Sequence, residues 1–487
     1  MARRGRAFGP IPDQISLHGR EGDSASLSDS LLAGSNVLLS GLPGVGKSSL
    51  ARAVTEQALS MGWTVRWASC DSDTDAAVIG GMWLGEGSPS SPSAIVGACE
   101  GTRTLLVLDE AQELHSRHAG GVVQLLDEAS LGSSSLLVVS RSPSPFGLPE
   151  GFSEFKLEGL ALEHARSLLP GDTDSATADS VAQALGGHPL ALRLWSPEEE
   201  VPERGEAVQE YIESTVMHRL SDEGTRTLDE FCIAPSSLRV SELFEAEGAD
   251  ELDDSAILRW SGLMAEPHHL IRNVRRGSWS DDQSTELHSQ AAGRWASRQG
   301  ARARRMEGHH LVHSGGPDVE WVCKNIHAIA EKDSASAAVL LEQALDLSGD
   351  ESIREAAADL ALERGEPRIA ESHIEGLSEG VGRKLRSARL ARLRGDPRSA
   401  EEIEAGALAE MTPAERTKAA IASLVRRYDD RLPGPIDRGL ARELSRGVRN
   451  VALSSLPESE RSAGSLALDL IRHGIALGTE DVAAAAE

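Results

Sequence analysis

The sequence predicts an α/β domain, a parallel sheet flanked by helices, followed by helical regions that extend to residue 487. Short apolar runs at 37–39, 65–68, 105–108 and 136–139 alternate with helix-like stretches, a pattern typical of a parallel sheet buried on both faces. A Gly-rich loop directly follows the first run. From about residue 158 the strand pattern fades and helical periodicity replaces it. We therefore expect the α/β fold in the first third of the chain.

Composition sets limits on the function. The 487 residues include 49 Lys+Arg and 76 Asp+Glu, a formal net charge of −27, and 40% are apolar. The length suggests roughly three domains, and the apolar content is enough for packed cores. The acid excess argues against a general nucleic-acid-binding protein, because phosphate binding needs clustered positive charge.

The sequence also bears on location. It has no run of about 18 apolar residues that would predict a membrane span, and no apolar run follows the basic N-terminus, so we expect no secretory signal. The four cysteines, which lie far apart without metal-ligand spacing, are expected to be buried thiols in a reducing compartment. These observations favour a cytoplasmic location. The cysteines are Cys70, Cys99, Cys232 and Cys323.

The Gly-rich loop has the sequence of a phosphate-binding loop. It matches G-x-x-x-x-G-K-S without a gap, follows a strand predicted at 36–40 and opens a helix predicted from Ser48, the context that this motif requires. Lys47 is expected to neutralise the β- and γ-phosphates, and the Ser48 hydroxyl to bind Mg²⁺. The residues expected to bind ATP or ADP here are Gly41, Leu42, Pro43, Gly44, Val45, Gly46, Lys47, Ser48 and Ser49.

Two later strand ends complete the predicted site. The run from Thr104 ends in Asp109 and Glu110. We expect Asp109 to hold Mg²⁺ and Glu110 to polarise the attacking water as a general base. The next strand ends at Arg141, whose cation is expected to sense the γ-phosphate. Together these residues predict ATP hydrolysis, with Glu110, Lys47 and Arg141 as the catalytic groups.

These pieces, in this order, resemble the STAND class of P-loop ATPases, which includes the NB-ARC group and is related to AAA+ ATPases. The resemblance covers about residues 15–300. Within that range, further segments also match motifs of the class, at 17–21, 140–141, 155–165 and 187–192. It implies that Gly19 and Arg20 pack over the adenine and that Pro189 contacts the base. It also implies that His288 approaches the β-phosphate and holds an ADP-bound, closed form. Ser289 departs from the Asp of the family's Met-His-Asp motif.

The domain organisation follows from these matches. We expect an N-terminal tail over 1–14, a P-loop ATPase domain over 15–157 and a helical lid over 158–200. A winged-helix-like domain is expected over 205–305. An α-helical region resembling tetratricopeptide repeats is expected over 310–487.

The predicted repeat rests on one recurring segment. Arg-Gly-Glu-Pro-Arg at 364–368 recurs as Arg-Gly-Asp-Pro-Arg at 394–398, 30 residues later, and a weaker copy begins at Lys332. Gly followed by Pro ends one helix and starts the next, and this period is typical of stacked helical hairpins. A helical bundle with two similar turns is the alternative.

A basic window within 272–305 leaves two interpretations open. Its arginines could contact DNA phosphates, or they could pair with acidic groups of this chain or of a neighbouring subunit. The net acidity of the chain disfavours DNA. The window contains Arg272, Arg275, Arg276, Arg294, Arg298, Arg302, Arg304 and Arg305.

Three functions fit the sequence. The first is a slowly hydrolysing ATP switch in which ADP holds a closed form, the repeats bind a protein partner, and ATP drives partner binding or homo-oligomer assembly. The second is an AAA+ or initiator-like ATPase on DNA, favoured by Asp-Glu-Ala-Gln at 109–112 and by the basic window. The third is a nucleotide-binding scaffold without turnover, which the intact Lys47, Ser48, Asp109 and Glu110 disfavour.

Overall fold

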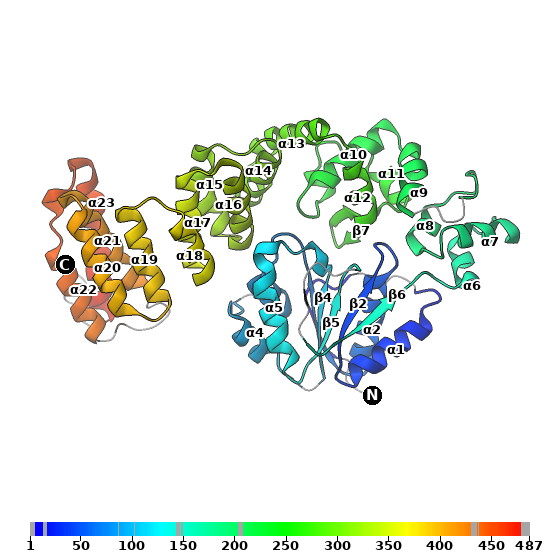
Figure 1. The fold of residues 1–487 in the computed structure, drawn as a ribbon, viewed down its shortest axis with the longest axis horizontal. Coiled ribbons are helices and arrows are strands. Elements are labelled where there is room, and N and C mark those ends of the chain that lie inside the picture. Colours follow the sequence, from blue (N-terminus) through cyan, green and yellow to red (C-terminus); the bar gives the residue numbers. More distant parts are fainter. Residues whose placement is uncertain are drawn as a thin grey trace. The chain divides into compact units, whose positions relative to one another are not determined.

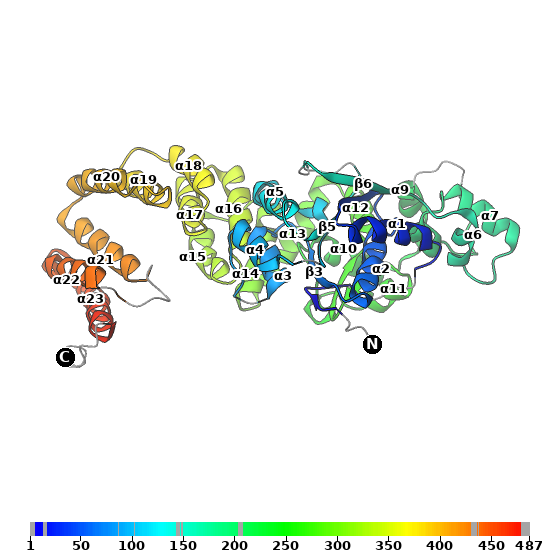
Figure 2. The same ribbon diagram turned by 90° about the horizontal axis from the view of Figure 1, so that it is seen from below.

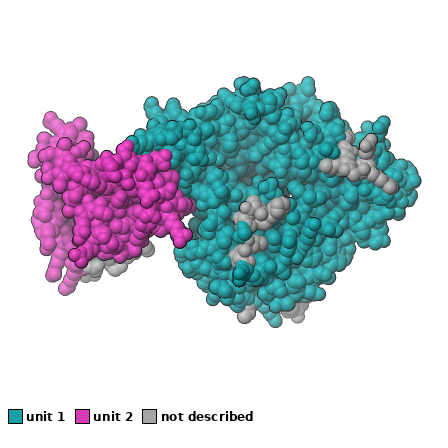
Figure 3. Space-filling view, in the orientation of Figure 1, with its two compact units in different colours: residues 1–353 teal, residues 354–487 magenta. Residues whose placement is uncertain are grey.

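The computed structural model describes residues 5–12, 17–85, 87–101, 103–142, 147, 150–202, 208–429, 436 and 438–478. Some predicted regions therefore lie partly outside the described residues. These are the tail (1–4, 13–14), the ATPase domain (15–16, 86, 102, 143–146, 148–149), the winged-helix-like domain (205–207) and the repeat region (430–435, 437, 479–487). The chain divides into two compact units, Met1–Ile353 and Arg354–Glu487 (Figure 3).

The first unit contains a six-stranded parallel sheet in the order β1-β3-β4-β5-β2-β6. The four strands predicted from apolar runs are confirmed. β1 is added at one edge of the sheet, and β6 at the other edge overlaps the segment from residue 155 that resembles the family's strand before the lid. The bounds are β1 Ala7–Phe8, β2 Asn36–Gly41, β3 Thr64–Ser69, β4 Thr104–Asp109, β5 Ser135–Val139 and β6 Phe152–Leu157.

Helices cover both faces of this sheet (Figures 1 and 2). Alternate residues of β4 face opposite ways: Leu105 and Val107 pack with α1 and α2, and Leu106 and Leu108 pack with α3, α4 and α5. This explains why the strands are apolar throughout. The helices are α1 Glu21–Leu32, α2 Lys47–Ser60, α3 Ala76–Leu84, α4 Pro92–Cys99 and α5 Ser116–Ser130.

After β6 the chain forms small helices and a β-hairpin that share one apolar core. The helices of the predicted lid are α6 Leu162–Ala165, α7 Ser175–Ala184 and α8 Pro189–Leu194, and α9 Val208–Tyr211 follows. We call residues 222–277 the hairpin module. It consists of α10 Asp222–Ile233, α11 Ala249–Asp254, β7 Leu258–Ser261, β8 Met264–Pro267 and α12 His269–Gly277. Its identity as a winged helix stays a prediction.

The rest of the described chain is helical apart from its turns and loops. The first unit continues through α13 Asp281–Ala296, α14 Ala301–His313, α15 Val319–Ala330 and α16 Ser334–Ser348, and α17 Glu351–Glu363 crosses into the second unit. The second unit continues with α18 Pro367–Glu375, α19 Val381–Leu393, α20 Pro397–Glu410, α21 Pro413–Asp429, α22 Arg438–Asn450 and α23 Glu458–Gly478.

The recurring segment forms the turns between helices, as predicted. Gly365 and Gly395 have φ of 69° and 79°, a left-handed conformation that glycine adopts without steric cost. Pro367 and Pro397 are then the first residues of α18 and α20, where a missing N–H costs nothing. The sequence therefore encodes equivalent helix–turn–helix joints.

Candidate nucleotide-binding and hydrolysis site

The phosphate-binding loop lies between the end of β2 and the start of α2, as predicted. Its Gly44 and Gly46 have φ of 79° and 99°, so both need glycine. The Lys47 ammonium donates to the carbonyls of Gly41 (3.0 Å) and Leu42 (2.9 Å). Burial lowers the pKa of Lys47, although Glu110 and Asp109 act to raise it. The loop therefore holds a buried cation beside helical N–H groups, which suits a phosphate chain.

Asp109, the last residue of β4, meets Ser48 of the first turn of α2. The Ser48 hydroxyl donates to Asp109 Oδ1 at 3.1 Å, and Asp109 is buried at the end of β4. Burial, together with nearby Glu110, raises the pKa of Asp109 to about 7. A hydroxyl and a carboxylate are the oxygen donors that Mg²⁺ prefers. The two predicted metal ligands therefore fit that ion.

Glu110 is held in an unusual conformation with its carboxylate already occupied. Its backbone is left-handed (φ 55°, ψ 35°), which costs a non-glycine residue energy that functional sites commonly store. Arg259 Nη1 of β7 donates to Glu110 Oε1 at 2.6 Å, and His269 Nε2 of α12 lies 3.4 Å from the same oxygen. Gln112 donates to the other oxygen. The hairpin module thus contacts the predicted general base.

These contacts set the charge state of Glu110. Burial acts to raise its pKa, but His269 and Arg259 outweigh burial and hold the pKa well below its usual range. Burial likewise acts to lower the pKa of Arg259, but Glu266 and Glu110 raise it. The pair is therefore a salt bridge between a full anion and a full cation, and in this state Glu110 is a poor proton acceptor.

Arg259 is itself fixed within the hairpin. It faces Glu266 across the β7–β8 pairing, and its Nε donates to Glu266 Oε1 at 2.9 Å. Glu266 also pairs with Arg272 of α12 at 3.3 Å. Sequence reasoning missed Arg259, Glu266 and His269. Hairpin alternation could have paired Arg259 with Glu266, but nothing in the sequence shows that the hairpin reaches Glu110, 149 residues away.

Arg141 follows β5 at the same edge of the sheet. Its backbone N–H donates to Gln112 Oε1 at 3.1 Å, and its side chain is exposed. Gln112 therefore connects the Arg141 backbone to the Glu110 carboxylate. The position at the strand tip agrees with the sequence, and a γ-phosphate contact by the guanidinium stays a prediction.

Two segments predicted to approach the nucleotide lie against the loop. Arg20 is buried and donates through Nη2 to the carbonyls of Val45 (3.2 Å) and Glu158 (2.5 Å). His188 Nε2 lies 2.8 Å from the Pro43 carbonyl oxygen. These contacts place both Gly19–Arg20 and His188–Pro189 against the phosphate-binding loop. Their contacts with adenine stay predictions.

His288 lies in a different environment from the one predicted. Its ring is buried on α13, and its Nδ1 lies 3.0 Å from His310 Nδ1 of α14. The His313 ring of α14 stacks on it, and the tilted His309 ring lies 5.7 Å away between centroids. In this conformation its contacts are with α14 histidines, and its approach to a β-phosphate stays a prediction. Glu110 instead has His269 at 3.4 Å. Burial and Arg259 lower the pKa of the adjacent His268 to about 4.

The arginines of the basic window have partners within the first unit. Arg275 pairs with Asp229 (2.5 Å) and Arg302 with Glu242 (2.7 Å). The other contacts are Arg272–Glu266, Arg276–Cys232 carbonyl, Arg294–Glu245, Arg304–Glu307, Arg305–Asp73 and Arg298 over the rings of Phe244 and Trp295. Of the two interpretations, this supports pairing with acidic groups of the chain.

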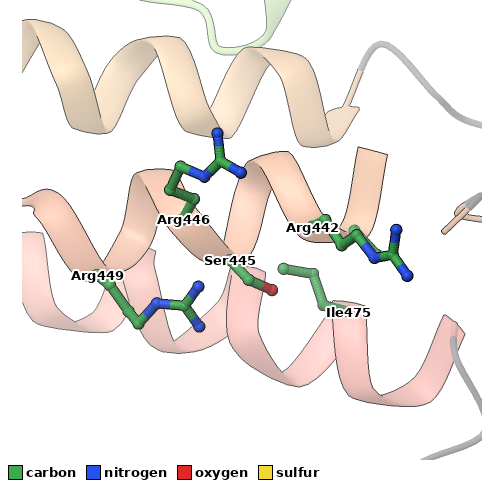
Figure 4. Close-up of a pocket in the computed structure, with 6 residues that line it drawn as sticks. Arg442, Ser445, Arg446, Arg449 and Ile475 are labelled. Carbon is green, nitrogen blue, oxygen red and sulfur yellow. The ribbon is translucent and has the colours of Figure 1, made fainter. Parts of the chain in front are cut away.

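A separate groove lies in the second unit. Figure 4 shows Arg442, Ser445, Arg446 and Arg449 along α22, with Ile475 of α23 beside them. The spacing of the three arginines places them on one face of a helix. The groove gives the helical region a basic surface in a chain of net charge −27.

Comparisons with known proteins bear on the fold of the chain. Residues 36–148 match the family model of the AAA domain (dynein-related subfamily). A solved Signal Transduction ATPase with Numerous Domains (STAND) protein with a tetratricopeptide repeat sensor, from Pyrococcus horikoshii, matches with a TM-score of 0.52 at 13% identity. The match covers 97% of this chain and 82% of that chain.

A RuvB variant from Thermotoga maritima also matches, over 56% of this chain and 99% of that chain at 16% identity. Its TM-score of 0.27 is too low to support an argument about fold. No curated protein matches the sequence. Among the described residues, no helix is both long and apolar enough to span a membrane.

The predicted fold class is confirmed. The chain has a STAND-like fold, an AAA-type P-loop ATPase domain followed by helical repeats. The assignment of particular residues to nucleotide, metal and catalysis rests on the geometry given above and stays a prediction.

Proposed function

We propose that this STAND-like P-loop ATPase is a slowly hydrolysing molecular switch, in which the nucleotide state gates conformation and partner binding or self-assembly. The observation that carries the proposal is the hydrogen-bonded ion pair of Arg259 with Glu110, beside which His269 Nε2 lies 3.4 Å from the same carboxylate oxygen. It joins the hairpin module to the residue best placed to activate water. A two-state switch needs a contact that suppresses hydrolysis in one state and also links two regions of the chain, here the hairpin module and the P-loop domain.

The roles of the residues follow from their positions. Bound ATP and Mg²⁺ supply the bond that is cleaved and the charge that offsets its phosphates. Lys47 holds the phosphates, and Ser48 and Asp109 hold the metal ion. Glu110 accepts a proton from water only when its carboxylate is free to reach that water. Hydrolysis is slow while Arg259 is paired with the Glu110 carboxylate, and the rate rises when the hairpin module moves away from Glu110.

The first test removes the Arg259 contact. Arg259→Gln should raise the single-turnover rate of ATP hydrolysis by about 5–150-fold, the range of a 1–3 kcal/mol coupling. Arg302→Gln is the matched control, because Arg302 forms an ion pair with Glu242 in the same unit without contacting Glu110. A rate in Arg259→Gln that equals or falls below that of both wild type and Arg302→Gln would contradict the proposal.

The second test asks whether nucleotide changes assembly. The native molar mass is measured by light scattering with ADP and with a non-hydrolysable ATP analogue, and Lys47→Ala serves as the control. We expect a defined oligomer with the ATP analogue alone, absent in Lys47→Ala. An unchanged monomer in both nucleotide states would rule out self-assembly as the output and leave a separate protein partner.

The helical region is the proposed partner surface. The similar Pyrococcus protein is described as having a tetratricopeptide repeat sensor, and the α18 and α20 joints of this chain have a repeated structure. Stacked helical repeats present extended surfaces for binding. We therefore place the sensor in the helices that follow the hairpin module.

A further inference from the structure

Four histidines gather where α13 packs on α14. His288 comes from α13, and His309, His310 and His313 come from α14. Their ring centroids lie 4.5 to 5.7 Å apart in the pairs that include His288 or His309. No role in nucleotide binding explains why four imidazoles share one site.

The ring nitrogens lie at spacings close to those of a metal site. One nitrogen from each of His288, His309 and His310 lies within 4.8 Å of the others, and His288 Nδ1 is 3.0 Å from His310 Nδ1. Zinc–nitrogen bonds of about 2.0–2.1 Å at tetrahedral angles place two nitrogens about 3.3 Å apart. A small adjustment of the rings would therefore bring three nitrogens around one ion.

The protonation state of the cluster suits a metal ion. Burial lowers the pKa of His288 and His310 to about 3, and it also lowers the pKa of His309 and His313. These imidazoles are therefore neutral near pH 7, which is the form that binds metal. In a metal-free cluster, by contrast, the two facing Nδ1 atoms can share only one proton between them.

We propose that His288, His309 and His310 form a zinc site, with the fourth position taken by His313 or water. His313 lies 4.9 Å from the His288 ring and 4.5 Å from the His309 ring, and it is exposed, so it stands at the solvent side of the cluster. Imidazole nitrogen is a ligand type that zinc favours. Aspartate and glutamate do not contribute to the described cluster.

One nearby charge opposes the ion. Arg276 of α12 is close enough to help lower the pKa of all four histidines. Its Nε donates to the Cys232 carbonyl, which fixes the guanidinium on the hairpin-module side. Substitution of Arg276 by glutamine should therefore strengthen zinc binding, because a repelling charge is removed.

A zinc ion at this site would link α13 to α14, two helices that connect the hairpin module to the helices after it. α13 follows the hairpin module, and α14 packs on α15 and α16. The apolar contacts of Trp295, Ala303 and Met306 already hold these helices together in one core. Zinc would add a link at the C-terminal end of α14, which is the end remote from the loop that joins it to α13.

The test uses the full chain, stripped of metal with a chelator and then titrated with zinc chloride. We expect about one zinc per chain by elemental analysis and calorimetry. His288→Gln and His309→Gln should each weaken zinc binding by about tenfold or more, since even outer contacts to zinc ligands are worth about 10–100-fold. His327→Gln, an exposed histidine on α15, is the matched control and should leave the affinity unchanged.

Two measurements distinguish the loss of a zinc ligand from misfolding of a variant. Each metal-free variant must keep the circular dichroism of the wild type, and His309→Gln must also keep its ADP affinity. X-ray absorption of the zinc-loaded wild-type chain should show a nitrogen shell with imidazole scattering, and this needs no variant. Less than about 0.1 zinc per chain at tenfold excess, or zinc whose affinity is the same in His288→Gln, His309→Gln and wild type, would overturn the proposal.

Discussion

Glu110 illustrates how much of this site depends on single side chains. Its backbone adopts a left-handed conformation, and both carboxylate oxygens are bonded, one by Arg259 and one by Gln112. The residue is therefore held away from a free, basic state by contacts that come from two separate regions. Under the proposed function, hydrolysis is controlled at this carboxylate by movement of the hairpin module that carries Arg259.

Substitution of Glu110 separates binding from chemistry. Glu110→Gln keeps the shape of the side chain but cannot accept a proton, so we expect hydrolysis to fall by about 100-fold or more while ATP binding persists. Single-turnover hydrolysis and equilibrium binding of a fluorescent ATP analogue measure the two effects. Equal losses of binding and hydrolysis would contradict the assigned role.

Lys47 should differ from Glu110, because its substitution weakens nucleotide binding itself. Lys47→Ala removes a charge-assisted hydrogen bond to phosphate, worth about 1.5–3 kcal/mol, so we expect ADP affinity to fall by about 10–150-fold. Calorimetric titration with ADP checks this, and Lys384→Ala serves as a control because Lys384 lies in the second unit, paired with Glu410. ADP affinity unchanged in Lys47→Ala would exclude the loop as the nucleotide site.

Site residues that belong to a continuous sequence motif could be predicted from the sequence. Contacts that form only when distant segments fold together could not be predicted. Lys47, Ser48 and Asp109 follow from strand ends that must meet at one edge of a parallel sheet. Arg259 and His269 reach Glu110 only because a distant hairpin packs there. His288 was placed by resemblance alone, and the contacts that the structure gives it, with His310 and its neighbours, are set by the packing of α13 on α14.

At the scale of elements, the β7–β8 hairpin positions the Arg259 guanidinium. Glu266 contacts both Arg259 and Arg272, so one carboxylate joins β7 to α12. Burial acts to raise the pKa of Glu266, but Arg259 and Arg272 lower it below its ordinary value. The ionised form is therefore favoured by folding.

Glu266→Gln should destabilise the chain by about 1–3 kcal/mol at pH 7, less than for a fully buried pair because the carboxylate is about one-quarter exposed. A lowered folded pKa means that this stabilisation is present above about pH 4.5 and is lost as the pH falls below it. Urea unfolding at pH 7 and pH 3.5 measures this. A difference between wild type and variant that is the same at both pH values would contradict the assignment.

The strands and repeat turns show what local sequence can predict. Four strands followed from apolar runs, whereas β1, with two residues, has too short a run to be recognised. The glycine–proline turns of α18 and α20 followed from conformational preference alone. The strands of the hairpin module were harder to predict from the sequence, because β7 and β8 each span only four residues.

At the scale of the whole molecule, the described nucleotide-site residues all belong to the first unit. A chain ending at residue 349, just before α17, should therefore bind ADP within about threefold of the full chain, a coupling below 1 kcal/mol. Calorimetric titration of both chains checks this. Loss of ADP binding in a shortened chain that retains its circular dichroism would show that the helical region contributes to the site.

The strand order also determines when the phosphate-binding loop can form during synthesis. β2, which carries the loop, pairs only with β5 and β6, so its hydrogen-bonding edges have no partner until the ribosome has added roughly 100 further residues. At about 5–20 residues per second this takes about 5–20 s. During that interval an apolar strand is exposed in the nascent chain, and this is the period in which a chaperone would protect it from aggregation.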